Sequence, residues 1–165
     1  MRLFAGLDHT DYQDVLRAFG RHLDTVECRD LRLVEQETGL TVQYRPAGDL
    51  GRGFQTLRVS DEELVSLLRR AYQLRGKGRQ PVNAANGLGL PYQELLRAIG
   101  RVLDAEHLRD LRLVEQPHGL MLQVTHAGQR RRSFQTYRLG TAQARMLVRI
   151  TAEQHETGSF GPPVA

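Results

Sequence analysis

The stretch Arg29-Asp30-Leu31-Arg32-Leu33-Val34-Glu35-Gln36 occurs twice in this chain, and the second copy runs from Arg109 to Gln116 with the same eight residues. The same offset of 80 residues places Phe54-Gln55-Thr56 on Phe134-Gln135-Thr136 without a gap. An ungapped match at a fixed offset indicates that one structural unit is present twice. The repeat is therefore the first constraint on the fold.

Each unit is expected to contain a helix, three strands and a second helix. In the first copy, apolar residues at helical spacing run from Tyr12 to Val26, with Thr10 or Asp11 as the cap. Strands are expected around 31–36, 40–45 and 54–59, and Ser60 with Glu63 forms a capping-box pattern before the second helix. In the second copy Pro91 suits a first helical turn, and Thr141 is expected to cap the last helix.

The predicted fold class is α+β, as a tandem duplication of an α-β-β-β-α unit in a pseudo-twofold arrangement. Each repeat should have an antiparallel three-stranded sheet with two helices on one face. The predicted organisation is repeat one over 1–74, a Gly/Asn/Pro-rich linker over 75–90, repeat two over 91–156 and a disordered tail over 157–165. The expected core comprises Leu16, Phe19, Leu33, Val42 and Leu67 with Leu96, Ile99, Leu113, Leu122 and Leu147.

Composition places the chain among ordinary globular proteins. It has 165 residues, of which 40% are hydrophobic and 25% are charged. No apolar run is long enough to cross a bilayer and the first residues do not resemble a signal peptide, so a cytoplasmic protein without a membrane partner is expected. Cys28 is the only cysteine, and because Leu108 occupies its place in the second copy, a buried thiol is expected.

Motifs for catalysis, cofactors or metals do not emerge from the sequence. The six histidines lack metal-ligand spacing, no G-x-S-x-G motif occurs, and the glycine-rich loop at 48–53 joins two strands rather than a strand and a helix. The paired acids Asp24 with Asp104, and Glu35 with Glu115, are expected to form surface ion pairs. The chain is therefore predicted not to be an enzyme, with no cofactor and no metal.

Charge is distributed unevenly along the second copy. The formal net charge is +4, but no acidic residue occurs between Glu115 and Glu153. Basic clusters of this kind attract phosphates through a field that salt weakens. Arginine, glutamine and phenylalanine also alternate out of phase with the predicted core on the strands, a composition that suits stacking and hydrogen bonding to nucleic acid. The predicted nucleic-acid-binding residues are Arg130, Arg131, Arg132, Arg145, Arg149, Arg112, Phe134 and Arg138.

The predicted function is a non-enzymatic nucleic-acid-binding protein, with a regulatory role, that uses the basic loop and helix of repeat two. The alternative is a protein-interaction or self-assembly module whose open sheet face is a homo-oligomer interface. A structural alternative for the same face is that the two sheets pack together, or extend across a pseudo-twofold axis, and bury it inside the protein. A weaker alternative is a small-molecule sensor with a pocket between the repeats.

The order of elements in each unit is similar to that of the double-stranded-RNA-binding domain, as an analogy of topology. The second copy has His118 in its hairpin loop and Arg145 on its second helix, but it lacks a run of lysines at the start of that helix. The analogy implies that this loop and this helix would contact phosphates.

Overall fold

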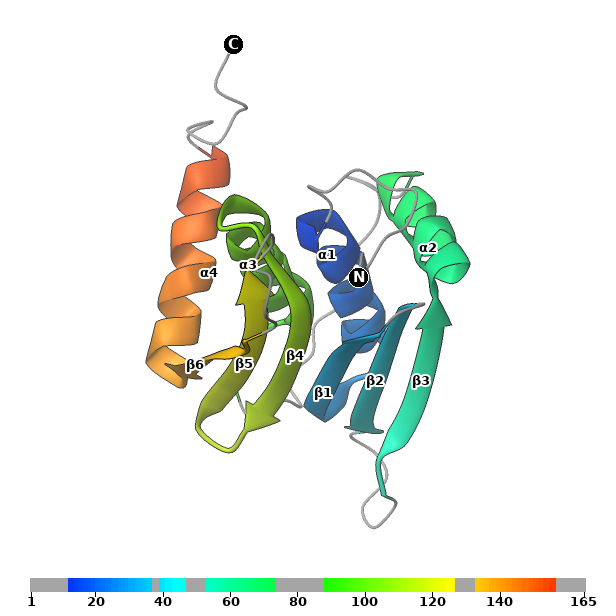
Figure 1. Cartoon of the computed structure of the whole chain (residues 1–165), viewed down its shortest axis with the longest axis horizontal. Helices are drawn as coiled ribbons and strands as arrows, with labels where there is room; N and C mark the ends of the chain where they lie inside the picture. Colours follow the sequence, from blue (N-terminus) through cyan, green and yellow to red (C-terminus); the bar gives the residue numbers. More distant parts are fainter. Residues whose placement is uncertain (1–11, 37–38, 47–52, 74–87, 127–132, 157–165) are drawn as a thin grey trace.

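The computed structural model describes residues 12–36, 39–46, 53–73, 88–126 and 133–156, and its elements occur in two successive sets with the same order (Figure 1). The N-terminal half comprises α1 (Tyr12–Thr25), β1 (Cys28–Gln36), β2 (Gly39–Pro46), β3 (Gln55–Ser60) and α2 (Asp61–Gln73). The C-terminal half comprises α3 (Tyr92–Ala105), β4 (Leu108–Gln116), β5 (Gly119–His126), β6 (Gln135–Gly140) and α4 (Thr141–Glu156). The fold is α+β, as predicted.

One antiparallel sheet runs through both halves. Its six described strands have the order β3-β2-β1-β4-β5-β6, so the prediction of separate three-stranded sheets is wrong. The halves join where β1 pairs with β4, with Leu33 opposite Leu113 and Arg32 opposite Val114. Alternation of apolar residues along a strand shows which side chains share a face, but it does not show which strand pairs with its edge. An unpaired edge strand leaves backbone N–H and C=O groups without partners. Pairing of β1 with β4 provides partners for these groups on both strands.

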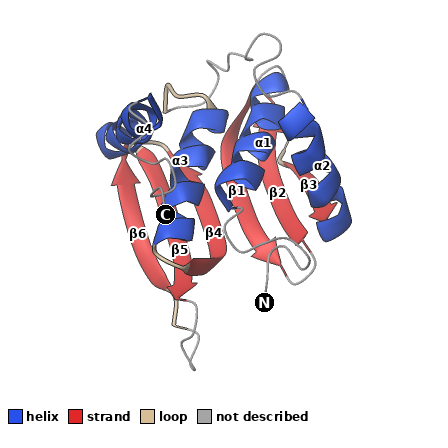
Figure 2. Ribbon diagram, turned by 90° about the horizontal axis from the view of Figure 1, so that it is seen from above, coloured by secondary structure: helices blue, strands red, loops and turns tan. Residues whose placement is uncertain are grey.

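The four described helices lie on one side of this sheet (Figure 2), with α1 and α3 side by side in the middle and α2 and α4 outside them. Two glycines allow the central helices to approach closely. A Cβ atom at Gly20 would lie 2.5 Å from the backbone oxygen of Tyr92, and one at Gly100 would lie 2.6 Å from that of Tyr12. None of these helices covers the opposite side of the sheet, which we call the open face.

Most of the predicted core is buried between the sheet and the helices. Leu16, Leu33 and Leu96 are fully enclosed, whereas Leu67 on α2 and Leu147 on α4 are half-buried because they lie on the outer helices. The remaining predicted core residues are buried as well: Phe19, Val42, Ile99, Leu113 and Leu122. Leu88, inside the predicted linker, also belongs to this core.

Helix starts agree only partly with the predicted caps. The Ser60 hydroxyl accepts a hydrogen bond from the Glu63 amide, as the capping-box pattern predicts. Thr141 is the first residue of α4 rather than its cap, and Pro91 precedes α3 as the N-cap residue without a side-chain cap. Thr10 and Asp11 lie outside the described residues. None of the described helices is long and apolar enough to cross a membrane.

Candidate functional site

The paired acids predicted on the surface instead hold the two halves together. Asp24, at the end of α1, is buried, and its two carboxylate oxygens accept hydrogen bonds from the Tyr92 and Gln93 amides at 2.8 and 3.0 Å. Asp104 does the same for the amides of Tyr12 and Gln13, at 3.2 and 3.1 Å. Each central helix thus supplies the N-terminal cap of the other, where unpaired amides favour a negative charge.

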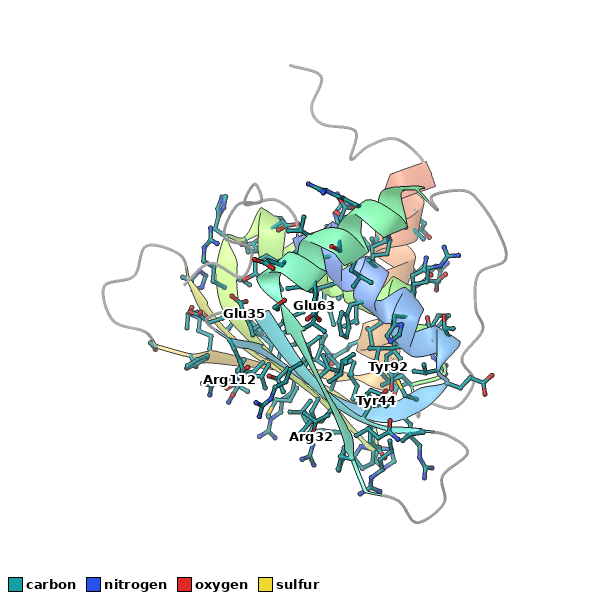
Figure 3. The ribbon with its side chains drawn as sticks, turned by 90° about the vertical axis from the view of Figure 1, so that its right-hand side faces the viewer. Arg32, Glu35, Tyr44, Glu63, Tyr92 and Arg112 are labelled. Carbon is teal, nitrogen blue, oxygen red and sulfur yellow. The ribbon has the colours of Figure 1, made fainter. Side chains whose placement is uncertain are left out.

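A second pair of acids lies between the sheet and the helices. Glu35 Oε1 accepts hydrogen bonds from the Tyr12 hydroxyl at 2.6 Å and from the Leu111 amide at 3.2 Å. Glu115 accepts one from the Tyr92 hydroxyl through Oε1 and one from the Asp30 amide, at 3.2 Å, through Oε2. Figure 3 shows Glu35 and Tyr92 on the helix side of the sheet. The surface position expected for these acids is therefore wrong for Asp24 and Glu35, which are buried.

Burial controls the protonation of these groups. It raises the pKa of Glu35 to about 7, although the hydrogen bonds from Tyr12 and Leu111 lower it in part. The pKa of Glu115 is raised for the same reason, and the pKa of both tyrosine hydroxyls is raised by burial and by the neighbouring carboxylates. Glu35 Oε2 is buried and has no hydrogen-bond partner among the described residues, which disfavours its charged form.

The open face carries arginine, glutamine, threonine and two phenylalanines. Arg32 on β1 and Arg112 on β4 flank the junction of the halves, and both point away from the helices (Figure 3). The neighbouring strands add further exposed arginines at Arg45, Arg58 and Arg138. Because side chains alternate along a strand, these residues share the side opposite the buried leucines of the same strands.

Each phenylalanine of the open face is stacked by arginine. The Arg112 guanidinium carbon lies 4.3 Å from the centre of the Phe134 ring, and that of Arg32 lies 4.4 Å from Phe54. Arg45 also lies over Phe54, at 4.7 Å. Stacking restricts the rotamers of these long side chains, so their cationic groups are held at defined places on the open face.

The carboxylates closest to the open face lie at bulges in β1 and β4. Asp30 lies 3.9 Å from the Nε atoms of Arg29 and Arg45, and Asp110 accepts a hydrogen bond from the Thr125 hydroxyl at 2.6 Å. Both aspartates have positive φ angles, 54° and 53°, where the strand register shifts. Apart from them, the strand positions of the open face carry no acid among the described residues. The surface is therefore basic.

The predicted binding residues do not form one surface. Arg112, Phe134 and Arg138 lie on the open face, whereas Arg145 and Arg149 are exposed on α4, on the helix side of the sheet. Arg149 Nε also pairs with Glu153 at 3.2 Å. Arg130, Arg131 and Arg132 lie outside the described residues. The sequence prediction did not select Arg32, Arg45, Phe54 and Arg58 as site residues, although their alternation with the core had placed them on this face.

The start of α4 and the turn before β5 are neighbours. The Thr141 amide donates a hydrogen bond to the backbone oxygen of His118 at 3.1 Å. The analogy with double-stranded-RNA-binding domains relates to this corner, which lies at the end of the β4–β5 hairpin, whereas Arg112 lies on the open face.

The Cys28 thiol is enclosed. Burial raises the pKa of the Cys28 thiol to about 12, and the thiol donates a hydrogen bond to the Leu23 backbone oxygen at 3.6 Å. Within the described ranges, no three His, Cys, Asp or Glu side chains are grouped so that they could hold a metal ion.

Comparisons with protein-family models, with curated proteins and with solved structures find no match to this chain. Function is therefore inferred from the geometry and charge of its surfaces alone.

Proposed function

We propose that the chain is a non-enzymatic, internally duplicated protein that binds single-stranded nucleic acid on its open face. The observation that carries this proposal is the pair of Arg–Phe stacks, Arg32 with Phe54 and Arg112 with Phe134, on either side of the β1–β4 junction. Guanidinium groups contact phosphates, and both guanidinium planes and aromatic rings stack on bases.

The duplication is supported by the reciprocity of the contacts between halves. Asp24 caps α3 as Asp104 caps α1. Glu35 accepts a hydrogen bond from the Leu111 amide, and Glu115 accepts one from the Asp30 amide, so each carboxylate bonds to the backbone of the other half. A pseudo-twofold axis near Leu33 and Leu113 relates the two Arg–Phe stacks, so a strand of nucleic acid would meet similar chemistry on both sides.

The Arg–Phe stacks favour single strands over duplexes. Bases of a single strand are free to stack on the guanidinium planes and ring edges of these pairs, whereas those of a duplex are already stacked on one another. Self-assembly through the same face is disfavoured. If two open faces packed together, the exposed arginines of one molecule would face those of the other and repel them; these arginines are Arg32, Arg58, Arg112 and Arg138.

The test is a comparison of two double variants that remove the same charge from opposite sides of the sheet. R32A/R112A changes the open face, and R145A/R149A changes α4. Binding to a mixed-sequence single-stranded oligonucleotide is followed by fluorescence anisotropy at several salt concentrations. R32A/R112A should weaken binding and flatten the slope of log affinity against log salt by about 0.7 for each phosphate that the variant no longer neutralises.

R145A/R149A should change the slope less, because these arginines lie away from the open face. The variant R130A/R131A/R132A measures whether the loop between β5 and β6 contributes. Equal slopes for the two double variants would indicate that nucleic acid is attracted only by the net charge of the protein, which contradicts the proposal. The proposal would also be rejected if the wild type showed no binding at about 50 mM salt, where phosphate contacts are strong.

A further inference from the structure

A cavity of about 350 Å³ opens on the helix side of the sheet in the C-terminal half. Its walls come from α3, the three strands β4 to β6, and α4. Ile99, Leu103, Leu122 and Val124 line its interior, and among the described residues of its walls the titratable side chains are Glu106, His126 and Tyr137. The cavity thus lies within one half, not between the two repeats as a sensor pocket was expected to lie, and on the opposite side of the sheet from the Arg–Phe stacks.

We infer that this cavity binds a small, neutral, largely apolar molecule of about the size of a fused bicyclic aromatic ring. An apolar cavity of about 150 Å³ accommodates benzene, so a volume of 350 Å³ admits roughly two such rings. The volume also falls in the range of natural ligand pockets, which begin at about 300 Å³ and are lined mainly by apolar side chains.

Polar groups gather at one end of the cavity. Gln135 Oε1 accepts a hydrogen bond from the Tyr137 hydroxyl at 2.8 Å and lies 3.0 Å from His126 Nε2. A few polar groups beside an apolar interior are what fixes the orientation of a ligand. A molecule with an apolar body and one hydrogen-bonding end therefore fits the arrangement.

Apolar side chains at the rim remain exposed. Tyr137 is 46% and Val102 is 36% exposed, although both line the cavity. Burial of such surface by a ligand contributes about 25 cal/mol for each Å² removed from water. The rim thus offers a driving force for binding as well as an entrance.

The N-terminal half has larger residues at two interior wall positions. Phe19 stands where the C-terminal half has Ile99, and Tyr44 stands where it has Val124. Phe19, Ile99 and Val124 are each about 1% exposed, and Tyr44 is half-buried against the core. At three other wall positions the N-terminal half has the smaller residue, because Cys28, Val42 and Val59 stand where the C-terminal half has Leu108, Leu122 and Leu139. Leu57 is also smaller than Tyr137, which stands at the rim. The two aromatic rings that the C-terminal half lacks contribute to the space.

The test uses the full chain and the neutral fluorescent probe prodan, a substituted naphthalene with one carbonyl acceptor, whose emission rises in apolar surroundings. The wild type should bind one probe per chain in a saturable manner. I99F/V124Y introduces the residues of the N-terminal half into the cavity and should weaken probe binding at least tenfold. Its melting temperature, measured in parallel, should equal or exceed that of the wild type, because filling a cavity restores packing.

Two further variants control for the effect of an added tyrosine and for misfolding of I99F/V124Y. V114Y adds the same atoms as V124Y on the open face, and it should bind the probe as the wild type does. V102E places a charge at the exposed rim without altering the core, so it should weaken binding even if I99F/V124Y fails to fold. Equal probe affinity for the wild type, I99F/V124Y and V102E, or no saturable binding by the wild type, would overturn the inference.

Discussion

Glu35 is a buried carboxylate whose two oxygens have different surroundings. Oε1 accepts two hydrogen bonds, whereas Oε2 has no partner among the described residues. Burial outweighs the hydrogen bonds and raises the pKa from 4.5 to about 7, with Asp110 raising it further. The contribution of this group to stability is therefore fully present below about pH 4.5 and is lost as the pH rises through 7.

The variant E35Q should remove this pH dependence. Between pH 5 and pH 8, the unfolding free energy of the wild type should fall relative to that of E35Q by up to about 3 kcal/mol, since one pKa unit corresponds to about 1.4 kcal/mol. Urea titrations across this range measure the difference. A difference that stays constant with pH would show that Glu35 does not change its protonation there.

The burial and the hydrogen-bond partners of Glu35 and Asp24 could not be predicted from the sequence. Both were recognised as paired between the copies, but a carboxylate beside arginines in a sequence looks the same whether it is solvated or buried. Only the joining of β1 to β4 and of α1 to α3 brings their partners, Leu111 and Tyr92, within reach. These two partners lie in the other copy, which no local pattern reveals, although Glu35 also bonds to Tyr12 of its own copy.

At the scale of elements, helix α1 packs on α3 through glycine. The Gly20 and Gly100 positions meet the backbone at the start of the facing helix, so a methyl group at either site would push the helices apart. This close approach also keeps Asp24 and Asp104 within hydrogen-bonding distance of the amides that they cap.

The variant G20A should therefore destabilise the protein by about 1 to 3 kcal/mol, as overpacking in a core does, despite the higher helix propensity of alanine. G53A is the matched control, because no atom lies within 4 Å of a Cβ at that position and its effect should be small. Chemical denaturation measures both. If G20A were as stable as G53A or the wild type, the close packing of α1 on α3 would be contradicted.

The strands were predictable as elements because apolar alternation and the repeat agree in both copies. Predicted strand positions 31–36 and 40–45 fall inside β1 and β2, and the open-face set follows from the same alternation. Extension of the two sheets across the pseudo-twofold axis was one of the alternatives left open, and the structure shows it as the pairing of β1 with β4. The sequence did not select it, since an edge strand carries no signal for its partner beyond its own pattern.

At the scale of the whole molecule, the sheet separates two chemistries. The open face carries stacked arginines and phenylalanines, and the helix side carries the shared core and the cavity of the C-terminal half. The site predicted from sequence combined residues of both sides, because the density of arginine along the chain does not report which side of the sheet each residue occupies.

The most direct test of nucleic-acid binding by the open face is mapping of backbone amide chemical shifts by NMR while a single-stranded oligonucleotide is added at low salt. The largest shifts should occur in β1, β4 and the starts of β3 and β6, around Arg32, Arg112, Phe54 and Phe134. Saturable shifts confined to α4, around Arg145 and Arg149, or no saturable shifts at all, would contradict binding at the open face.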